Sequence, residues 1–142
     1  MSKIITFCNE IKTRLNGLSE FAGIPVILDR QQEVASDIAK ALGKMQAVIV
    51  LYPMPTKRVA DPQVSDHFLM TVEIEVHTLP ITSTAAACDD IAEDVARALD
   101  SWMRPSAPSA ANDDRVVVRL LTPVPDPDYL VWRVVVSART FL

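Results

Sequence analysis

The stretch FLMTVEIEVH, residues 68–77, decides the fold because its side chains alternate between two kinds of surface. The apolar set is Phe68, Met70, Val72, Ile74 and Val76, and the other set is Leu69, Thr71, Glu73, Glu75 and His77. Alternation over ten residues is the period of a β-strand. The stretch therefore predicts a central strand that packs on helices through one face and leaves its polar face to water or to a partner.

Residues 130–140 repeat this pattern at the end of the chain. Here Leu130, Trp132, Val134, Val136 and Ala138 alternate with Val131, Arg133, Val135, Ser137 and Arg139. If the two strands are neighbours, the arginines on one could pair with Glu73 and Glu75 on the other. Such cross-strand pairs contribute ~0.2–1 kcal/mol each, so they would help to fix the register of the strands.

The first half of the chain predicts two helices and two further strands. A helix is expected over residues 2–16, with Ser2 as its cap, Gly17 at its end, and Ile4, Cys8, Ile11, Leu15 and Leu18 on its apolar side. A short strand over residues 25–28 follows. Asp29 and Gln32 form a capping-box pattern for a second helix that Gly43 ends. Residues 46–52 (QAVIVLY) are apolar on both faces, which predicts a strand inside the sheet.

The connections of the second half are long. Residues 53–66 carry three prolines and are expected to form an extended arm between strands 46–52 and 68–77. Thr82, Ser83 and Thr84 are candidate caps for a third helix, acidic on its outer side, that runs to about Met103. The Pro/Ser/Ala stretch 104–114 predicts a flexible loop, and residues 116–122 a further strand.

The resulting order is α-β-α-β-β-α-β-β. It predicts an α+β fold in which a mixed or antiparallel sheet of about five strands has helices packed on one face. The middle part, β-α-β-β-α-β, is also the order of a split βαβ sandwich, so a ferredoxin-like module is an alternative. At 142 residues, the chain is expected to form a single domain, residues 1–142.

Composition excludes several classes of function. Fourteen basic and eighteen acidic residues give a net charge of −4, which argues against specific binding of nucleic acid. No apolar run approaches the ~20 residues of a membrane span, and the N-terminus is too polar for a signal sequence, so a soluble protein of the cytoplasm is expected. Cys8 and Cys88 occupy apolar helix positions and are predicted to be buried thiols, although a disulfide is possible.

No combination of residues indicates catalysis. His67 and His77 lie ~33 Å apart along one strand and cannot share a metal or substrate. Glu73 and Glu75 have ~7 Å between their Cα atoms, a spacing that glycosidase carboxylates can show, but adjacent acids are common on solvated sheets. No nucleophile elbow, phosphate-binding glycine loop or calcium loop is present. The sequence therefore predicts no enzyme, no cofactor and no metal site.

The layout of the whole chain resembles the tail terminator and tail completion proteins of long-tailed bacteriophages and prophages. The likeness begins with an N-terminal helix, followed by ILDRQQEVASDIAKALGK as the end of a strand plus a capped helix. It continues through the long-armed hairpin VIVLYPMPTKRVADPQVSDHFLMTVEIEVHTL, the acidic helix AAACDDIAEDVARALDSW, and two closing strands that end in VWRVVVSARTFL. The resemblance implies an α+β structural virion protein that forms a hexameric ring. The ring would cap the tail tube, halt its polymerisation and offer a docking surface to the head.

This resemblance also implies partners and a location. The partners would be copies of the chain itself, the tail tube protein and the head–tail connector proteins. The protein would reside in the virion tail, after assembly in the host bacterial cytoplasm. A ring subunit needs two different patches that meet head to tail. The interface candidates are Lys57, Arg58, Asp61 and Asp66 in the arm and Glu73, Glu75, Arg133 and Arg139 on the polar sheet face.

Overall fold

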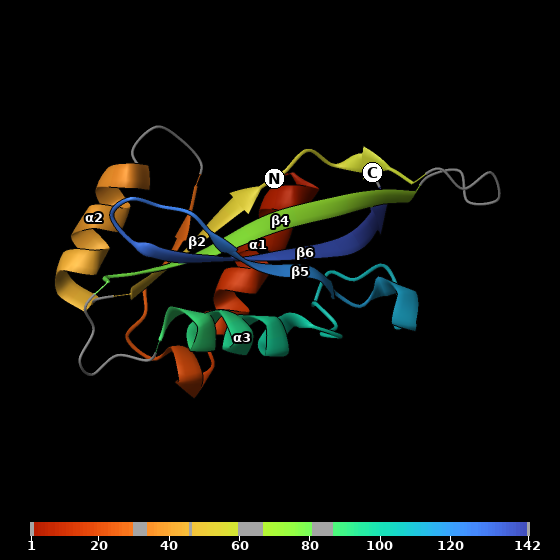
Figure 1. Cartoon of the computed structure of the whole chain (residues 1–142). Helices are drawn as coiled ribbons and strands as arrows, with labels where there is room; N and C mark the ends of the chain where they lie inside the picture. Colours follow the sequence, from red (N-terminus) through yellow and green to blue (C-terminus); the bar gives the residue numbers. More distant parts are fainter. Residues whose placement is uncertain (1, 30–33, 46, 60–66, 81–86, 142) are drawn as a thin grey trace.

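The computed structural model describes residues 2–29, 34–45, 47–59, 67–80 and 87–141. Its helices are α1 (Lys3–Asn16), α2 (Val34–Met45) and α3 (Cys88–Leu99), with short 3-10 turns η1 (Ser19–Phe21) and η2 (Asn112–Asp114). Its strands are β1 (Val26–Leu28), β2 (Ala47–Pro53), β3 (Lys57–Arg58), β4 (His67–Thr78), β5 (Val117–Val124) and β6 (Leu130–Phe141). The element order confirms the predicted α+β arrangement, with β3 as an added two-residue strand (Figure 1).

The sheet is mixed and open, with strand order β1-β2-β4-β6-β5, and β3 pairs with β4 beside this path. Strand β1 runs parallel to β2, and the other pairs are antiparallel. Because β1 and β2 are direct neighbours joined through α2, no strand separates them. The split βαβ sandwich, the alternative fold, is therefore not formed.

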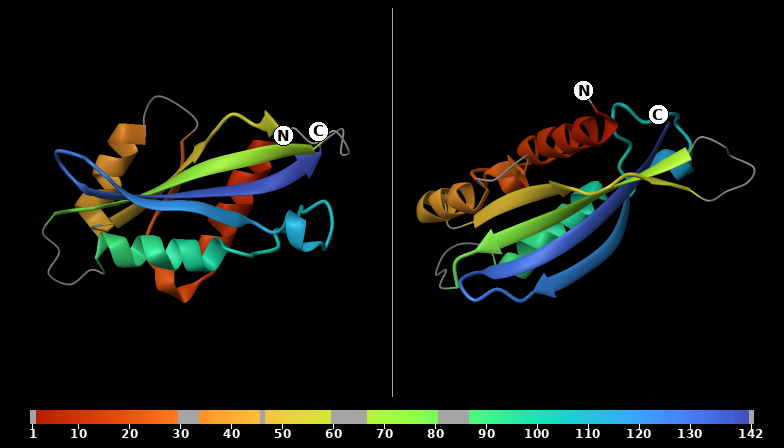
Figure 2. Two further views of the ribbon diagram at one scale, coloured as in Figure 1. Left: turned by 45° about the vertical axis from the view of Figure 1, so that its right-hand side comes forward. Right: turned by 90° about the horizontal axis from the view of Figure 1, so that it is seen from above.

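The two long strands β4 and β6 form the centre of the sheet (Figure 2). Their register pairs Val72 with Val136 and Glu75 with Arg133. On the inner side of β4, the side chains of Met70, Val72, Ile74 and Val76 are completely buried, as are Val134 and Val136 on β6. The alternation predicted for both strands is thus confirmed.

Helices α1 and α3 cover the inner side of the sheet and form the larger core with it. The Ser2 hydroxyl accepts a hydrogen bond from the Ile5 N–H and Gly17 follows the last helical residue, so both predicted ends of α1 are confirmed. The buried side chains of α1 include three of the predicted residues and Phe7, which the predicted stripe omits; they are Phe7, Cys8, Ile11 and Leu15.

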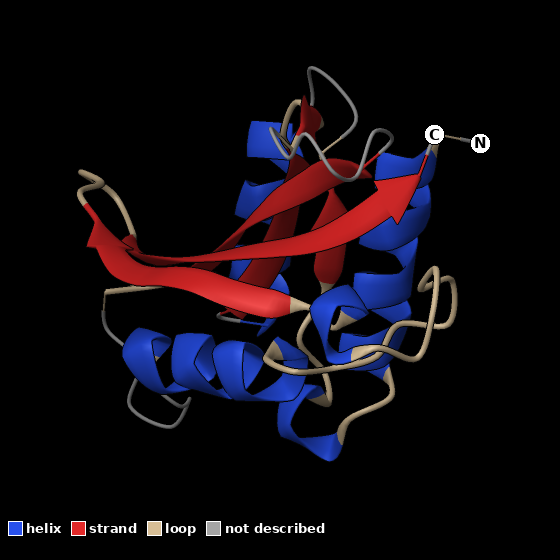
Figure 3. Cartoon of the chain, turned by 90° about the vertical axis from the view of Figure 1, so that its right-hand side faces the viewer, coloured by secondary structure: helices blue, strands red, loops and turns tan. Residues whose placement is uncertain are grey.

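Helix α2 packs on the opposite side of the sheet, which differs from the expectation of helices on one face (Figure 3). Its Ile38 and Leu42 contact Val48 and Val50 of β2, whose neighbours Ile49 and Leu51 point into the larger core. All four β2 side chains are completely buried. Strand β2 is therefore covered on both sides, as its doubly apolar sequence predicts.

Two helix ends differ from the predictions. Helix α2 continues through Gly43 to Met45, since a glycine inside a helix costs only about 1 kcal/mol relative to alanine. Helix α3 ends at Leu99 and not near Met103, because Ser101 adopts a left-handed backbone (φ 63°) and its N–H donates to the Val116 carbonyl at 2.8 Å. Gln32 and the candidate caps Thr82, Ser83 and Thr84 lie outside the described residues.

Candidate functional site

The side of the sheet that bears Glu73, Glu75 and Arg133 is the candidate site, and we call it the outer face. On this side α2 covers the region around β2, where its cluster also includes Tyr52 and Tyr129. The larger core that contains α1 and α3 lies on the other side of β4 and β6. The outer face of β4, β6 and β5 is thus left without a helix among the described elements (Figure 3).

Arg133 connects the two carboxylates that the sequence placed on this face. Its guanidinium donates to Glu75 Oε2 from two nitrogens, at 2.7 and 3.2 Å, and its Nε lies 3.6 Å from Glu73 Oε2. The pairing follows from the register, because Glu75 lies directly opposite Arg133 across β4 and β6. The predicted cross-strand pairs are therefore confirmed for Arg133.

His77, on the same strand as Glu75, contacts the second oxygen of its carboxylate. Its Nε2 lies 3.1 Å from Glu75 Oε1, so the Nε2-protonated form donates a hydrogen bond there. This hydrogen bond lowers the pKa of Glu75, burial opposes it, and the hydrogen bonds from Arg133 lower the pKa further. Glu75 is therefore held as a stable anion. A carboxylate stabilised in this way is poorly suited to act as a general acid.

Tyr52 borders the same cluster from β2. Its pKa is raised from 10.0 to about 12 by burial and then by the negative charges of Glu75 and Asp29. Its phenol consequently stays neutral over the physiological range. Tyr129 approaches the His77 ring edge-on with 6.2 Å between ring centroids. The aromatic and charged side chains at this end of the outer face thus lie against one another, and His77 Nδ1 is buried without a hydrogen-bond partner among the described residues.

Arg139 pairs with a different acid from the one that sequence reasoning gave it. Its Nε and one terminal nitrogen donate to Asp114 Oδ1 at 3.1 and 2.9 Å, and the Ser109 hydroxyl donates to the other Asp114 oxygen. Burial raises the pKa of Asp114, but the hydrogen bonds from Ser109 and Arg139 outweigh it and leave the pKa lowered. Residue Leu69 lies opposite Arg139, so the strand register offers it no glutamate.

A second buried charge anchors the other end of the 104–114 loop. Arg104 is only 3 % exposed, and it donates to Glu10 Oε1 at 3.2 Å and to the Arg139 carbonyl at 3.0 Å. The Ser106 N–H donates to the other Glu10 oxygen at 2.8 Å. Each end of this loop, expected to be flexible, is therefore tied to a neighbouring element by a buried charged side chain.

The remaining candidate residues occupy separate places. Lys57 and Arg58 form the exposed strand β3, where the Arg58 guanidinium lies over the Phe68 ring at 5.6 Å. Asp61 and Asp66 lie outside the described residues. Both histidines are 6 % exposed: His67 packs on Phe141, and His77 contacts Glu75.

Sequence reasoning missed three exposed or charged residues of β5 that also lie on the outer face. Val117 and Leu120 are 37 % and 50 % exposed, and Arg119 donates from its Nε to the Ser137 hydroxyl at 2.7 Å. A bulge between Val118 and Leu120 shifts the alternation of β5 by one residue. A strict period of two therefore assigns the wrong face to part of this strand.

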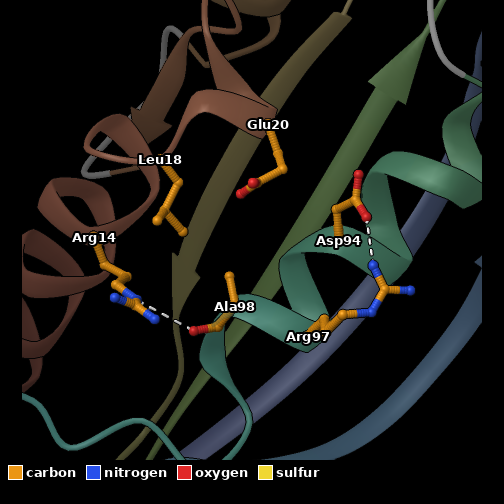
Figure 4. A pocket seen from close by; sticks show the side chains of 6 residues that line it. All are labelled: Arg14, Leu18, Glu20, Asp94, Arg97 and Ala98. Carbon is orange, nitrogen blue, oxygen red and sulfur yellow. Dashed lines mark hydrogen bonds and ion pairs between the residues drawn. The ribbon is translucent and has the colours of Figure 1, made fainter.

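A surface pocket between α1, η1 and α3 is lined by two arginines and two carboxylates among other residues (Figure 4). Arg14 donates to the Ala98 carbonyl at 3.3 Å, and Arg97 pairs with Asp94 at 2.7 Å. The hydrogen bonds of both arginines are thus made within the chain, and the charges of the lining balance.

Other features of the described residues bear on chemistry. No disulfide joins Cys8 and Cys88, and both thiols are buried, as predicted. Within the described part of the chain, no group of three or more histidine, cysteine, aspartate or glutamate residues is placed to hold a metal ion. None of the described helices has the length and apolar character needed to cross a membrane.

Comparison with known proteins identifies the fold alone. No protein-family model matches the chain, and no curated protein matches its sequence. Among solved structures, one whose name is a sequence identifier without a functional description aligns with a TM-score of 0.57 and 11 % sequence identity. The alignment covers 100 % of this chain and 98 % of that one. The same α+β architecture therefore extends over both chains from end to end.

Proposed function

We propose that this chain is a structural virion protein of a phage or prophage, a tail terminator or tail completion protein. It forms a ring, in this reading a hexamer, that caps the tail tube and joins it to the head. The observation that carries the proposal is the outer face of β4, β6 and β5, which mixes apolar and charged side chains and which no described helix covers. A mixed surface of this kind is typical of a contact between proteins.

The electrostatics of this face support assembly over catalysis. Arg133 and His77 contact Glu75, Arg139 contacts Asp114, and Glu73 lies 3.6 Å from Arg133, so each of these carboxylates already has a charged or hydrogen-bonding partner. Pre-organised ion pairs fix side chains in place before a partner arrives, which lowers the entropic cost of binding. The layout of the sequence, which resembles tail terminators over nearly the whole chain, supplies the identity of the partner: the tube protein and the connector proteins.

The alternative, a ferredoxin-like module that binds a small molecule, has less support. Its fold needs the split βαβ strand order, whereas here β1 and β2 are adjacent.

Deletion of the gene from its phage tests the proposal. We expect tails of abnormal length that do not join heads, as seen by electron microscopy, and normal length when the wild-type gene is supplied from a plasmid. Leu120→Asp places a charge at a half-exposed outer-face position, and we expect it not to restore tail length. Ala110→Asp, at an exposed loop position, is the matched control and should restore it. Normal tails after deletion would contradict the proposal.

Mass measurement separates the two functions without a phage. A terminator is expected to be a monomer or a six-fold ring, since such rings can await the tube before they assemble. A stable dimer whose melting temperature rises with a small molecule would favour the ligand-binding module.

A further inference from the structure

Four large apolar side chains are exposed among the described residues, and they lie on two different sides of the sheet. They are Val117, Leu120, Leu130 and Phe141. Val117 and Leu120 pair with Ser137 and Val135, which face outward together with Arg133. Leu130 has the opposite parity on β6 and so points to the inner side, at the hairpin end of the strand. The molecule thus presents two separate apolar patches.

The first patch has an arginine among its apolar side chains, and we call Val117, Arg119 and Leu120 the Arg119 patch. The hydrogen bond from Arg119 to the Ser137 hydroxyl places its side chain on the outer face beside Val117. No carboxylate lies within ion-pairing distance of Arg119 in the described part of the chain. Arginine between apolar residues is a frequent anchor of protein interfaces, because it combines charge with a flat contact surface.

The second patch is a hollow of about 340 Å³ between the β5–β6 hairpin and the beginning of α3. We call it the Leu130 hollow. Its lining includes Leu130, Pro123 and Pro125, together with the carboxylates of Asp89 and Asp126. Asp126 uses its Oδ1 to accept the N–H groups of Asp128 and Tyr129, and neither Asp126 nor Asp89 is in an ion pair with a described residue. The hollow is therefore apolar and negative, where the Arg119 patch is apolar and positive.

We propose that the Arg119 patch of one copy docks into the Leu130 hollow of a second copy. The two patches are complementary in charge, both expose apolar residues, and they lie on opposite sides of the sheet, so the contact is head to tail. Repetition of such a contact gives a ring if the rotation between copies closes. This inference rests on the proposed ring and specifies the surfaces through which its subunits meet.

Pairwise cysteine cross-linking tests the contact directly. Leu120→Cys and Leu130→Cys are made as separate proteins, and disulfide-linked dimers are measured after oxidation of each protein alone and of their mixture. The protein concentration is raised until the contact is populated even between copies that are monomeric when dilute. A head-to-tail contact predicts a yield several times higher in the mixture than in either protein alone. The native thiols are buried, and burial raises the pKa of Cys88, so the unsubstituted protein is expected to give no dimer.

Two controls give the test its specificity. A mixture of Leu130→Cys with Ala110→Cys, an exposed loop position, should not exceed the yields of the single proteins. Adding Arg119→Glu to Leu120→Cys should lower the mixed yield, and adding Asp89→Lys to Leu130→Cys should restore it. Circular dichroism verifies that these exposed substitutions leave the fold intact.

Either of two results would overturn the inference: equal yields in the mixture and in the single proteins, or a mixed yield that Arg119→Glu leaves unchanged. The outcome is separable from that of the proposed function. Abnormal tails after deletion together with no mixed cross-link would leave the tail function standing and reject these surfaces. Normal tails together with a charge-dependent mixed cross-link would reject the tail function and leave the contact between these surfaces standing.

Discussion

The inner and outer faces of β4 belong to the same twelve residues but are stabilised by different interactions. On the inner face, Val72 and Ile74 are completely buried under α1 and α3, and the main stabilising term is removal of apolar surface from water. On the outer face, Glu73 and Glu75 are stabilised by a neighbouring arginine at 3.6 and 2.7 Å. The comparison shows that one strand can support the core with one face while the side chains of the other face are stabilised by charge pairs.

The largest loss of stability is expected from a charge placed on the inner face of β4. Val72→Asp places a carboxylate where no solvent reaches and leaves it without a partner, so we expect a loss of about 4 kcal/mol or more in the free energy of unfolding. Urea denaturation followed by circular dichroism measures this loss. A variant as stable as the wild type would show that the inner side is open to water.

Arg104 tests whether a buried charge is tolerated only when it has an ion-pair partner. Arg104→Met leaves Glu10, whose side chain is 11 % exposed, without its ion-pair partner, and we expect a loss of about 3 kcal/mol. The matched control is Arg97→Met, which removes an exposed pair with Asp94 and should cost about 0.5 kcal/mol or less. Equal losses for the two variants would contradict the role of burial.

Arg133 tests the outer face in the same way. Arg133→Met removes the hydrogen bonds to Glu75 and the contact with Glu73, and we expect a loss of about 1–2 kcal/mol because the pair is only partly buried. Thermal or urea unfolding measures it. Glu75→Gln should cost a similar amount, and the double variant should cost less than the sum of the two, since both remove one interaction.

Acid should weaken the protein through Glu75 and Asp114, the two acids that pair with the outer-face arginines. The pKa values of Glu75 and Asp114 in the folded chain lie below their ordinary values of 4.5 and 3.8. Each group therefore contributes stability that is fully present above its ordinary pKa and is lost as the pH falls through its lower, folded value. Unfolding free energies from neutral pH to about 3 should show this fall, and Glu75→Gln should make it shallower. A profile that Glu75→Gln leaves unchanged would contradict the assignment.

The smallest expected effect is that of Glu73→Gln. The Glu73 side chain is 29 % exposed, and its carboxylate lies 3.6 Å from Arg133, which already has Glu75 as a closer partner, so the loss should be about 0.5 kcal/mol or less. A loss as large as that of Val72→Asp would reject the assignment of the two faces.

Local patterns in the sequence predict much of this fold correctly. The alternation of residues 68–77 and 130–140, the cap at Ser2 and the doubly apolar strand all depend on neighbours along the chain, and all are confirmed, the last over residues 47–52, since residue 46 lies outside the described residues. The pair between Glu75 and Arg133 could be anticipated because both lie on polar faces of long strands. Arg139, on the same polar face, was expected to pair with a glutamate, but its partner Asp114 lies in a loop that gives no periodic signal.

The sequence by itself determined which side chains of each strand point together, because that depends only on backbone geometry within the strand. Only the tertiary structure decided which element lies over each side: α2 on the outer side of β2, α1 and α3 on the inner side, and β6 beside β4. It also decided that the β5 bulge brings Arg119 beside Val117 on the outer face. These placements depend on contacts between residues far apart in the chain, and no local pattern encodes such contacts.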